Sequence, residues 1–243
     1  MRVLAKSDIG KARDMNQDYF YVSSLDDDIK LYILADGMGG YKGGEIASNL
    51  AVNCTKNYIC NNWSKIEKDK IEIMNLINSA IEYANMIVYE KSLEIEELHD
   101  MGTTLEVVIL WNNKVFIGHV GDSRVYRIRK NVMRRLTTDH SYVEKLIKDG
   151  SITKDEAYHH PNKNMLLKAL GCNSLVKPDV FYKGFLKGDI LLMCSDGLTN
   201  MLKENEIYSI LLNNPDKPEI ALINEANKMG GIDNITAIIV DNV

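Results

Sequence analysis

The spacing of hydrophobic and polar residues predicts a chain in which blocks of β-strands alternate with pairs of helices. Apolar runs of strand length, bounded by turn residues, are expected at residues 1–8, 18–24, 30–35, 103–111, 114–120, 123–129, 132–136, 178–183, 189–195 and 235–241. Apolar residues at helical spacing predict helices over residues 45–62, 67–93, 204–213 and 217–229. The segment from Thr138 to Leu170 is polar and helical in character, and it separates two of the strand blocks.

Short turns indicate how these strands pair. Asn112-Asn113 and Lys130-Asn131 each leave two residues between apolar runs, which is typical of β-hairpins. The only strand–helix–strand connections pass through helix pairs. This order argues against a parallel doubly wound sheet and predicts an α+β fold, with antiparallel sheets that carry helices on the outside. Because no repeat, low-complexity tract or linker interrupts the chain, we expect residues 1–243 to form a single domain.

Composition narrows the class of protein. The chain has 243 residues, is 45% hydrophobic and 26% charged, and has a net charge of −5. Such a length and apolar content are sufficient for a sizeable core. The acidic balance gives no sign of nucleic-acid binding, because that needs clustered positive charge. An acidic chain that binds an anionic substrate needs a local source of positive charge, and bound cations are the obvious one.

The cysteines and the lack of long apolar runs predict a cytoplasmic protein. Cys54, Cys60, Cys172 and Cys194 form no CxxC pair, so we expect reduced thiols and no zinc site. The chain contains no run of 18 or more apolar residues, so we expect no membrane span. The first ten residues lack the apolar core of a signal peptide.

Two apolar runs end on the dipeptide Asp-Gly. The first ends at Asp36-Gly37 and the second at Asp196-Gly197, while Asp233 stands just before the last apolar run. A single Asp-Gly is most often only a turn. Both phosphate-loop alternatives fail on spacing, since Lys42 replaces the last glycine of a dinucleotide fingerprint and Glu45 replaces the lysine of a P-loop.

Five acidic residues stand at turns or strand ends, namely Asp18, Asp36, Asp122, Asp196 and Asp233. If they converged without cations they could not all stay ionised, because like charges in one site raise each other's pKa. Divalent cations remove this repulsion. Oxygen ligands without Cys or His are typical of Mg²⁺ or Mn²⁺ sites rather than zinc sites. Acids at strand ends are, on the other hand, usually only solvated.

Eight short motifs together resemble the metal-dependent type 2C protein phosphatases, the PPM family, and most closely its bacterial serine/threonine branch. In chain order they are Asp8-Ile9-Gly10 through Arg13, Asn16-Gln17-Asp18, Ala35-Asp36-Gly37-Met38-Gly39-Gly40, Gly102-Thr103-Thr104, Gly121-Asp122-Ser123-Arg124, Thr138-Asp139-His140-Ser141, Ser195-Asp196-Gly197-Leu198 and Asp233-Asn234-Ile235-Thr236. The resemblance covers essentially the whole chain. It implies a four-layer αββα sandwich with two central antiparallel sheets.

The resemblance also implies a site with two Mn²⁺ or Mg²⁺ ions and a third ion beside them. Asp36 would bridge the two metals, the carbonyl of Gly37 would bind one of them, and Asp196 and Asp233 would bind the other. Asp122, with Asp196, would hold the third. Asp18 would orient metal-bound water from behind the ligands, and Arg13 would bind the substrate phosphate. The expected catalytic residues are Arg13, Asp36 and Asp18.

The implied reaction is hydrolysis of phosphoserine and phosphothreonine on proteins by a metal-activated water. Met38 stands where many eukaryotic members carry a histidine proposed as the general acid, and methionine has no proton to donate. A metal-bound water is then the first candidate for the leaving-group acid, with His140 or His160 second. The insert at residues 141–168 corresponds to a flap, which we expect to contribute to the choice of protein substrate.

The expected partners are phosphoproteins and an opposing bacterial serine/threonine kinase, with the chain itself a monomer. Two alternatives remain at this point. One is a regulatory phosphatase dedicated to a single stress or sporulation partner, which the lack of an appended sensor domain argues against. The other is an inactive scaffold that binds phosphoproteins. Loss of Asp36, Asp196 or Asp233 would mark such a scaffold, and all three are present.

Overall fold

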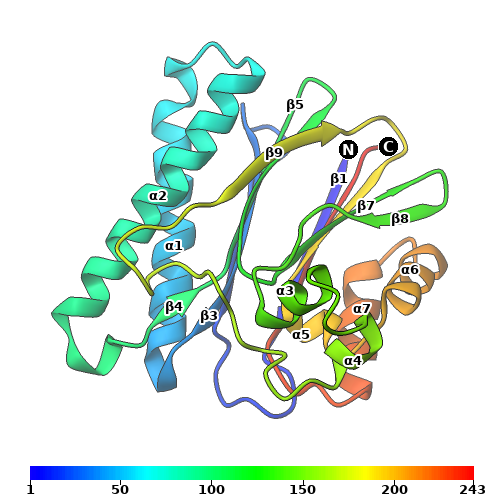
Figure 1. The fold of residues 1–243 in the computed structure, drawn as a ribbon. Coiled ribbons are helices and arrows are strands. Elements are labelled where there is room, and N and C mark those ends of the chain that lie inside the picture. Colours follow the sequence, from blue (N-terminus) through cyan, green and yellow to red (C-terminus); the bar gives the residue numbers. More distant parts are fainter.

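Two antiparallel sheets lie face to face between two layers of helices (Figure 1). The computed structural model describes the backbone of residues 1–243 and every side chain except that of Tyr41. One sheet has the order β1 (Arg2–Asp8), β11 (Ile235–Asp241), β10 (Ile190–Cys194), β7 (Arg124–Arg129) and β8 (Val132–Arg135). The other has the order β2 (Asp18–Val22), β3 (Lys30–Met38), β5 (Leu105–Trp111), β6 (Lys114–Val120) and β9 (Asp179–Gly184), and β4 (Gly102–Thr103) pairs with β3.

Helices cover the outer face of each sheet. The long pair α1 (Gly40–Asn62) and α2 (Lys70–Glu94) packs on the β3 sheet, and α5 (Asp196–Thr199), α6 (Glu204–Asn213) and α7 (Pro218–Lys228) pack on the β10 sheet. Short 3₁₀ turns follow the long helices at η1 (Trp63–Lys65) and η2 (Glu96–Leu98). The predicted four-layer αββα arrangement is therefore confirmed.

The alternation of side chains along β3 explains why both of its faces are buried. Tyr32 and Leu34 point into the core between the sheets, whereas Leu31, Ile33 and Ala35 point into the core beneath α1 and α2. A strand buried on both faces is expected to be apolar at every position, because successive side chains point to opposite sides. This explains the unbroken apolar run before Asp36.

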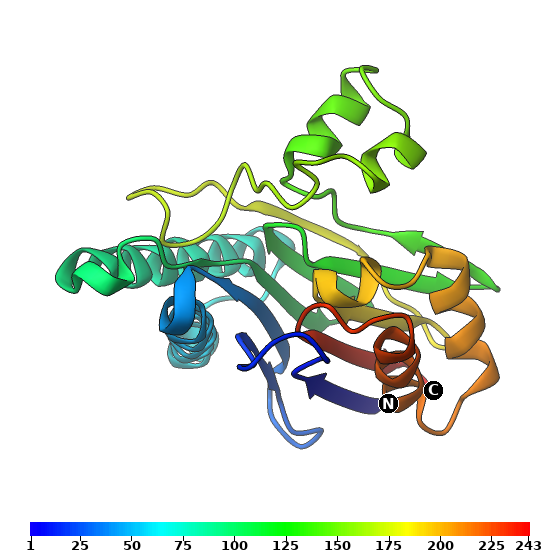
Figure 2. The same cartoon turned by 90° about the horizontal axis from the view of Figure 1, so that it is seen from below.

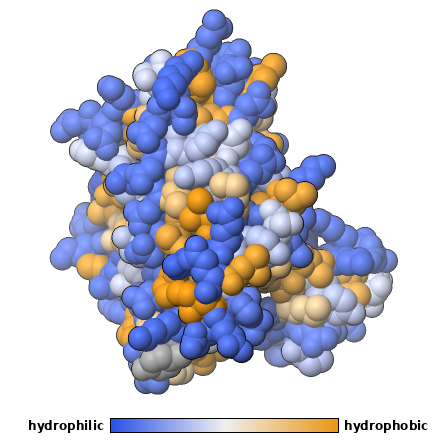
Figure 3. Space-filling model, turned by 90° about the vertical axis from the view of Figure 1, so that its left-hand side faces the viewer, coloured by the Kyte–Doolittle hydropathy of each residue, from blue (hydrophilic) through white to orange (hydrophobic). Residues whose placement is uncertain are grey.

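The helical layer formed by α1 and α2 leaves some apolar side chains in contact with solvent. Figure 3 shows this face of the molecule, where hydrophilic side chains surround a central strip of hydrophobic ones. On α2, Ile71, Tyr83, Met86 and Leu93 are exposed. None of the helices described is both long and apolar enough to cross a membrane.

The flap, residues 141–168, stands away from the sandwich (Figure 2). It carries two short helices, α3 (Tyr142–Lys148) and α4 (Lys154–Tyr158). Ser141 caps α3 and Thr153 caps α4, because each hydroxyl accepts a hydrogen bond from a backbone N–H in the first turn. The helical character predicted for this segment is confirmed.

Most predicted elements lie where they were expected, although β3 continues past residue 35 to Met38 and so includes Asp36 and Gly37. Three further differences concern the elements around it and after β10. Helix α1 begins at Gly40 rather than at residue 45, so the glycine-rich stretch forms its first turns. The strand predicted at 103–111 is split, because Thr104 leaves the ladder between β4 and β5. Helix α5 was not predicted at all, since four residues are too few to show a helical period.

Candidate metal centre

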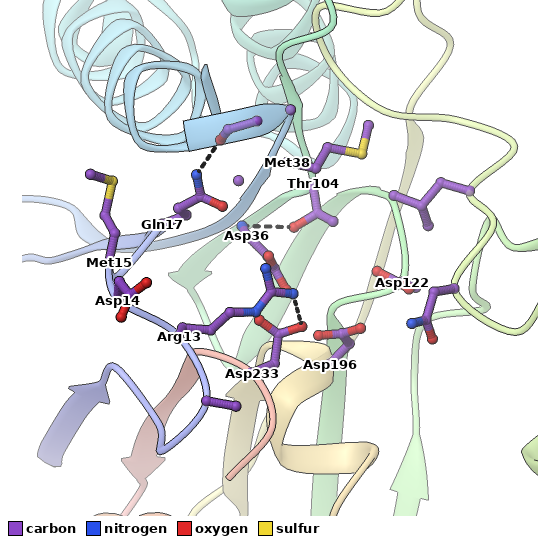
Figure 4. A pocket seen from close by; sticks show the side chains of 16 residues that line it. Arg13, Asp14, Met15, Gln17, Asp36, Met38, Thr104, Asp122, Asp196 and Asp233 are labelled. Carbon is purple, nitrogen blue, oxygen red and sulfur yellow. Dashed lines mark hydrogen bonds and ion pairs between the residues drawn. The ribbon is translucent and has the colours of Figure 1, made fainter. Parts of the chain in front are cut away.

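Four of the predicted aspartates line one cavity of about 480 Å³ at the edge where several strands end (Figure 4). They are Asp36, Asp122, Asp196 and Asp233, which come from four separate parts of the chain. The predicted metal ligand Gly37 and the predicted phosphate ligand Arg13 line the same cavity. Apart from Asp18, every site residue predicted from the sequence thus lies at its surface.

Threonine hydroxyls hold the backbone of Asp36 at the end of β3. The N–H of Asp36 donates to Thr104 Oγ1 at 3.0 Å, and its carbonyl accepts from Thr103 Oγ1 at 2.9 Å and from the Thr104 N–H at 2.9 Å. The Thr104 hydroxyl also bonds to Ser123 Oγ at 2.9 Å. The sequence analysis included Thr103 and Thr104 in a motif but predicted no role for them.

Gly37 permits the close approach of β3 and α1. A Cβ atom at this position would lie 2.1 Å from the carbonyl oxygen of Gly44, so no other residue fits without moving the helix. Gln17 Nε2 donates to the carbonyl of Gly40 at 3.0 Å and ties the loop before β2 to the same helix. The glycine cluster therefore serves close packing rather than a phosphate loop.

His140 holds the turn that carries Asp122. Its backbone N–H donates to the Gly121 carbonyl at 2.7 Å, and its Nδ1 accepts from the Gly121 N–H at 3.2 Å. Gly121 has φ +115°, a conformation that favours glycine. Neither His140 nor His160, the two histidines considered as general acids, lines the cavity with the aspartates.

Asp196 follows β10 and Asp233 precedes β11, at the same end of this antiparallel strand pair. Asp196 is the first residue of α5, and its Oδ2 accepts from Asn200 Nδ2 at 2.9 Å. Asp233 Oδ1 accepts from the N–H of Asn234 at 2.9 Å, and its Oδ2 pairs with Arg13 Nη2 at 2.9 Å. The Arg13 side chain is 49% exposed, so the guanidinium remains accessible from the cavity.

Asn234 fixes the loop that brings Arg13 to the cavity. Its Nδ2 donates to the carbonyls of Ile9 and Met15, each at 2.9 Å, and its Oδ1 accepts from the Gln17 N–H at 2.8 Å. Asn234 contacts the Asp233 carboxylate only through its backbone N–H. The side chain serves the loop instead, which no local signal in the sequence revealed.

Asp18 lies behind the cavity wall and is 7% exposed. It is paired in register with Asp36 across β2 and β3. Its Oδ2 accepts from Ser195 Oγ at 2.7 Å and from Thr236 Oγ1 at 2.6 Å, whereas its Oδ1 is buried without a hydrogen-bond partner.

Burial and mutual repulsion disturb the titration of these carboxyl groups. Burial, followed by the charges of Asp18, Asp196, Asp122 and Asp233, raises the pKa of Asp36 well above its usual value. Burial, and next the charge of Asp196, does the same for the pKa of Asp122. Burial raises the pKa of Asp18 to about 7, although the hydrogen bonds from Thr236 and Ser195 lower it.

This donor set fits hard divalent cations. A carboxylate cluster that repels itself is stabilised by bound positive charge, and the unpartnered Oδ1 of Asp18 is an acceptor that a bound water could satisfy. Among the residues described, no three His, Cys, Asp or Glu side chains form a complete metal cage. Mg²⁺ and Mn²⁺ are bound by oxygen ligands and keep several waters, so waters would complete the coordination of ions held by these aspartates.

Comparison with known proteins decides the family. Residues 10–214 match the family described as protein phosphatase 2C. The chain belongs to the protein phosphatase 2C family. Serine/threonine phosphatase stp of Listeria monocytogenes is 39% identical over 238 residues, 97% of this chain and 94% of that protein. Protein phosphatase PhpP of Streptococcus pneumoniae is 37% identical over 246 residues, 99% of this chain and 97% of that protein.

Solved structures of the family share the whole fold. The serine/threonine phosphatase of S. agalactiae has a TM-score of 0.89 and 36% identity, covering 99% of each chain. The catalytic domain of the phosphatase PstP, solved in complex with two manganese ions, has a TM-score of 0.86 and 29% identity, covering 99% of this chain and 97% of that one. The protein is accordingly a protein serine/threonine phosphatase of the bacterial PPM type, as the eight motifs predicted.

Proposed function

We propose that this phosphatase domain hydrolyses phosphoserine and phosphothreonine on proteins with the help of divalent cations held by the aspartates of the cavity. The observation that supports this most directly is the convergence of Asp36, Asp122, Asp196 and Asp233 with one accessible arginine on a single cavity. Arginine suits a phosphate because its planar fork donates two hydrogen bonds to phosphate oxygens. An acidic site requires cations before it can accept such a dianionic group.

The residues have distinct proposed roles. Asp36 and the Gly37 carbonyl would hold one Mn²⁺ or Mg²⁺ ion, and Asp36, Asp196 and Asp233 a second. Asp122, with Asp196, would hold a third. When bound, such ions activate water as a nucleophile and neutralise charge on the phosphoryl group.

Arg13 would contact the substrate, and Asp18 would act from behind the metal-binding aspartates. Arg13 now pairs with Asp233, and the phosphate of the substrate would take over hydrogen bonds from its guanidinium. Stabilising the charge that develops on the phosphoryl oxygens lowers the barrier to transfer. Asp18, fixed by Ser195 and Thr236, would use its free Oδ1 to orient a water at the ligands.

A second cavity of about 670 Å³ lies between the flap and helices α5 and α6, and it shares Asp122, Asn164 and Asp196 with the first. We propose that the polypeptide around the phosphorylated residue lies here, so that the flap contributes to substrate choice. Replacing the flap should then reduce hydrolysis of phosphopeptides far more than that of a small aryl phosphate. An equal loss on both substrates would reject this role.

The metal requirement is tested by aryl phosphate hydrolysis with Mn²⁺, Mg²⁺ or chelator, in wild type, Asp36→Ala and Asp216→Asn. We expect chelator to abolish hydrolysis in wild type, Asp36→Ala to be inactive with an unchanged circular dichroism spectrum, and the exposed control Asp216→Asn to behave as wild type. Hydrolysis that persists in chelator would rule out the proposed mechanism.

A phosphopeptide panel tests the substrate class. We expect phosphoserine and phosphothreonine peptides to be hydrolysed, and a purely phosphotyrosine-specific activity would contradict the proposal. An opposing serine/threonine kinase, a cytoplasmic location and a monomeric state remain predictions of the sequence.

A further inference from the structure

Among the described residues, one side-chain hydrogen bond attaches helix α4 of the flap to the rest of the molecule. Among the side chains described, two hydrogen bonds run from residues 142–164 to residues outside the flap. Arg135 Nη2 donates to Glu144 Oε2 of α3 at 3.0 Å. Tyr158 Oη, at the end of α4, donates to the backbone carbonyl of Asn200 at 2.8 Å. The second bond is the one that holds α4.

Asn200, whose carbonyl accepts the hydrogen bond from Tyr158, also donates a hydrogen bond to the candidate metal ligand Asp196. Asn200 caps the C-terminus of α5, where its Nδ2 donates to Asp196 Oδ2 at 2.9 Å and its N–H donates to the Asp196 carbonyl at 2.7 Å. A side chain that donates to a ligating carboxylate fixes its orientation and tunes its affinity for metal. Tyr158, Asn200 and Asp196 form a continuous chain of contacts from the flap to the metal centre.

This chain of contacts lies at the second cavity. Tyr158, Asn200 and Asp196 all line it, together with side chains of α3, α4 and α6. The Tyr158 ring is 38% exposed, so its attachment depends on the hydroxyl more than on burial. Lys163 Nζ lies 5.3 Å from the ring centroid, and this contact does not involve the hydroxyl.

We propose that Tyr158 and Asn200 are positioning residues that couple attachment of the flap, through the Tyr158–Asn200 hydrogen bond, to divalent-cation binding at Asp196. The inference depends on the proposed role of Asp196 as a metal ligand. When Tyr158 binds the Asn200 carbonyl, the α5 terminus is held and the Asn200 amide keeps Asp196 oriented. Because coupling between two binding events is reciprocal, metal binding at Asp196 in turn stabilises the attachment of Tyr158 to Asn200.

Two substitutions separate the two contacts. Tyr158→Phe removes the hydroxyl and keeps the ring, whereas Asn200→Ala removes the amide and keeps the carbonyl that receives Tyr158. Tyr208→Phe is the matched control for the first, because Tyr208 Oη donates to the carbonyl of Asn131 at 2.7 Å, away from the flap. For the second, the control is Asn214→Ala, which alters the C-cap of α6, where Asn214 Nδ2 donates to the Ile210 carbonyl at 2.9 Å.

Two measurements are made without substrate on the full chain. Calorimetric titration with Mn²⁺ gives the affinity of the site that Asp196→Asn abolishes, and hydrogen exchange reports opening of residues 154–160. We expect Asn200→Ala to weaken this Mn²⁺ affinity about 10- to 100-fold. We expect Tyr158→Phe to speed exchange of α4 about two- to tenfold, the factor expected for one hydrogen bond, and to weaken Mn²⁺ affinity by no more than that factor.

Hydrogen exchange of α4, measured with and without Mn²⁺, tests the coupling between the flap and the metal centre. Mn²⁺ should slow exchange of α4 in wild type and in both controls, and it should lose this effect in Tyr158→Phe and Asn200→Ala. The inference is overturned if α4 exchanges equally fast in wild type and Tyr158→Phe, or if Asn200→Ala binds Mn²⁺ as wild type does. Wild-type protein that hydrolyses phosphate in chelator and binds no Mn²⁺ would instead overturn the proposed function, and the inference with it.

Discussion

The two adjacent threonines that hold Asp36 should differ sharply in their importance for stability. Thr104 is 2% exposed, and its hydroxyl serves both the Asp36 N–H and Ser123 Oγ. Thr104→Val keeps the shape of the side chain but leaves two buried polar groups without a partner. Each such group costs about 1–3 kcal/mol. We therefore expect the free energy of unfolding to fall by about 2–6 kcal/mol.

Thr103→Val is the internal control. The Thr103 hydroxyl donates to the Asp36 carbonyl, but that carbonyl also accepts the Thr104 N–H and stays satisfied when the hydroxyl is removed. Only one net hydrogen bond is lost, worth about 0.5–1.5 kcal/mol.

Urea denaturation with chelator present, followed by far-UV circular dichroism, measures both changes without a contribution from bound metal. For a chain of this size, the larger loss lowers the melting temperature by roughly 4–24 °C. If Thr103→Val proves as destabilising as Thr104→Val, the hydroxyl of Thr104 does not carry the role that its contacts indicate.

Three further changes test the site. Because burial and neighbouring carboxylates raise the pKa of Asp36, Asp36→Asn should abolish turnover while stabilising the chelated protein against urea; a less stable variant would contradict the repulsion. Arg13→Ala should raise KM for an aryl phosphate about tenfold or more, and an unchanged KM would exclude its phosphate role. Burial, with the nearby His119 and Lys168, lowers the pKa of His140 to about 4, so the unfolded chain binds more protons below pH 6.5. Protonation of His140 should then cost the folded state up to about 3 kcal/mol as pH falls from 6.5 to 4, so the stability of His140→Asn should rise relative to wild type by up to this amount; parallel pH profiles would refute this assignment.

Hydrogen bonds between distant segments account for what sequence reasoning missed at the site. The side chain of Asn234 binds the loop at residues 9–17 across more than 200 positions of sequence. The amide of Asn200 reaches Asp196 within one helical turn, but α5 is too short to be predicted. His140 clamps Gly121 from 19 residues away. No periodic pattern encodes the pairings of Asn234 and His140, because both depend on where the chain folds back.

Local patterns along the chain were sufficient to predict most of the elements and the α+β class, and the resemblance carried by the eight motifs added the αββα layers and the family. Alternating apolar residues need buried faces, paired asparagines adopt positive φ at the β5–β6 turn, and acids at strand ends need cations. The folded arrangement alone decided that four aspartates share one cavity, that Arg13 faces Asp233, and that the flap reaches Asp196 through Asn200. The physical reason is that side-chain period and turn chemistry act over a few residues, whereas a metal centre is assembled from strand ends that only the register of two packed sheets brings together.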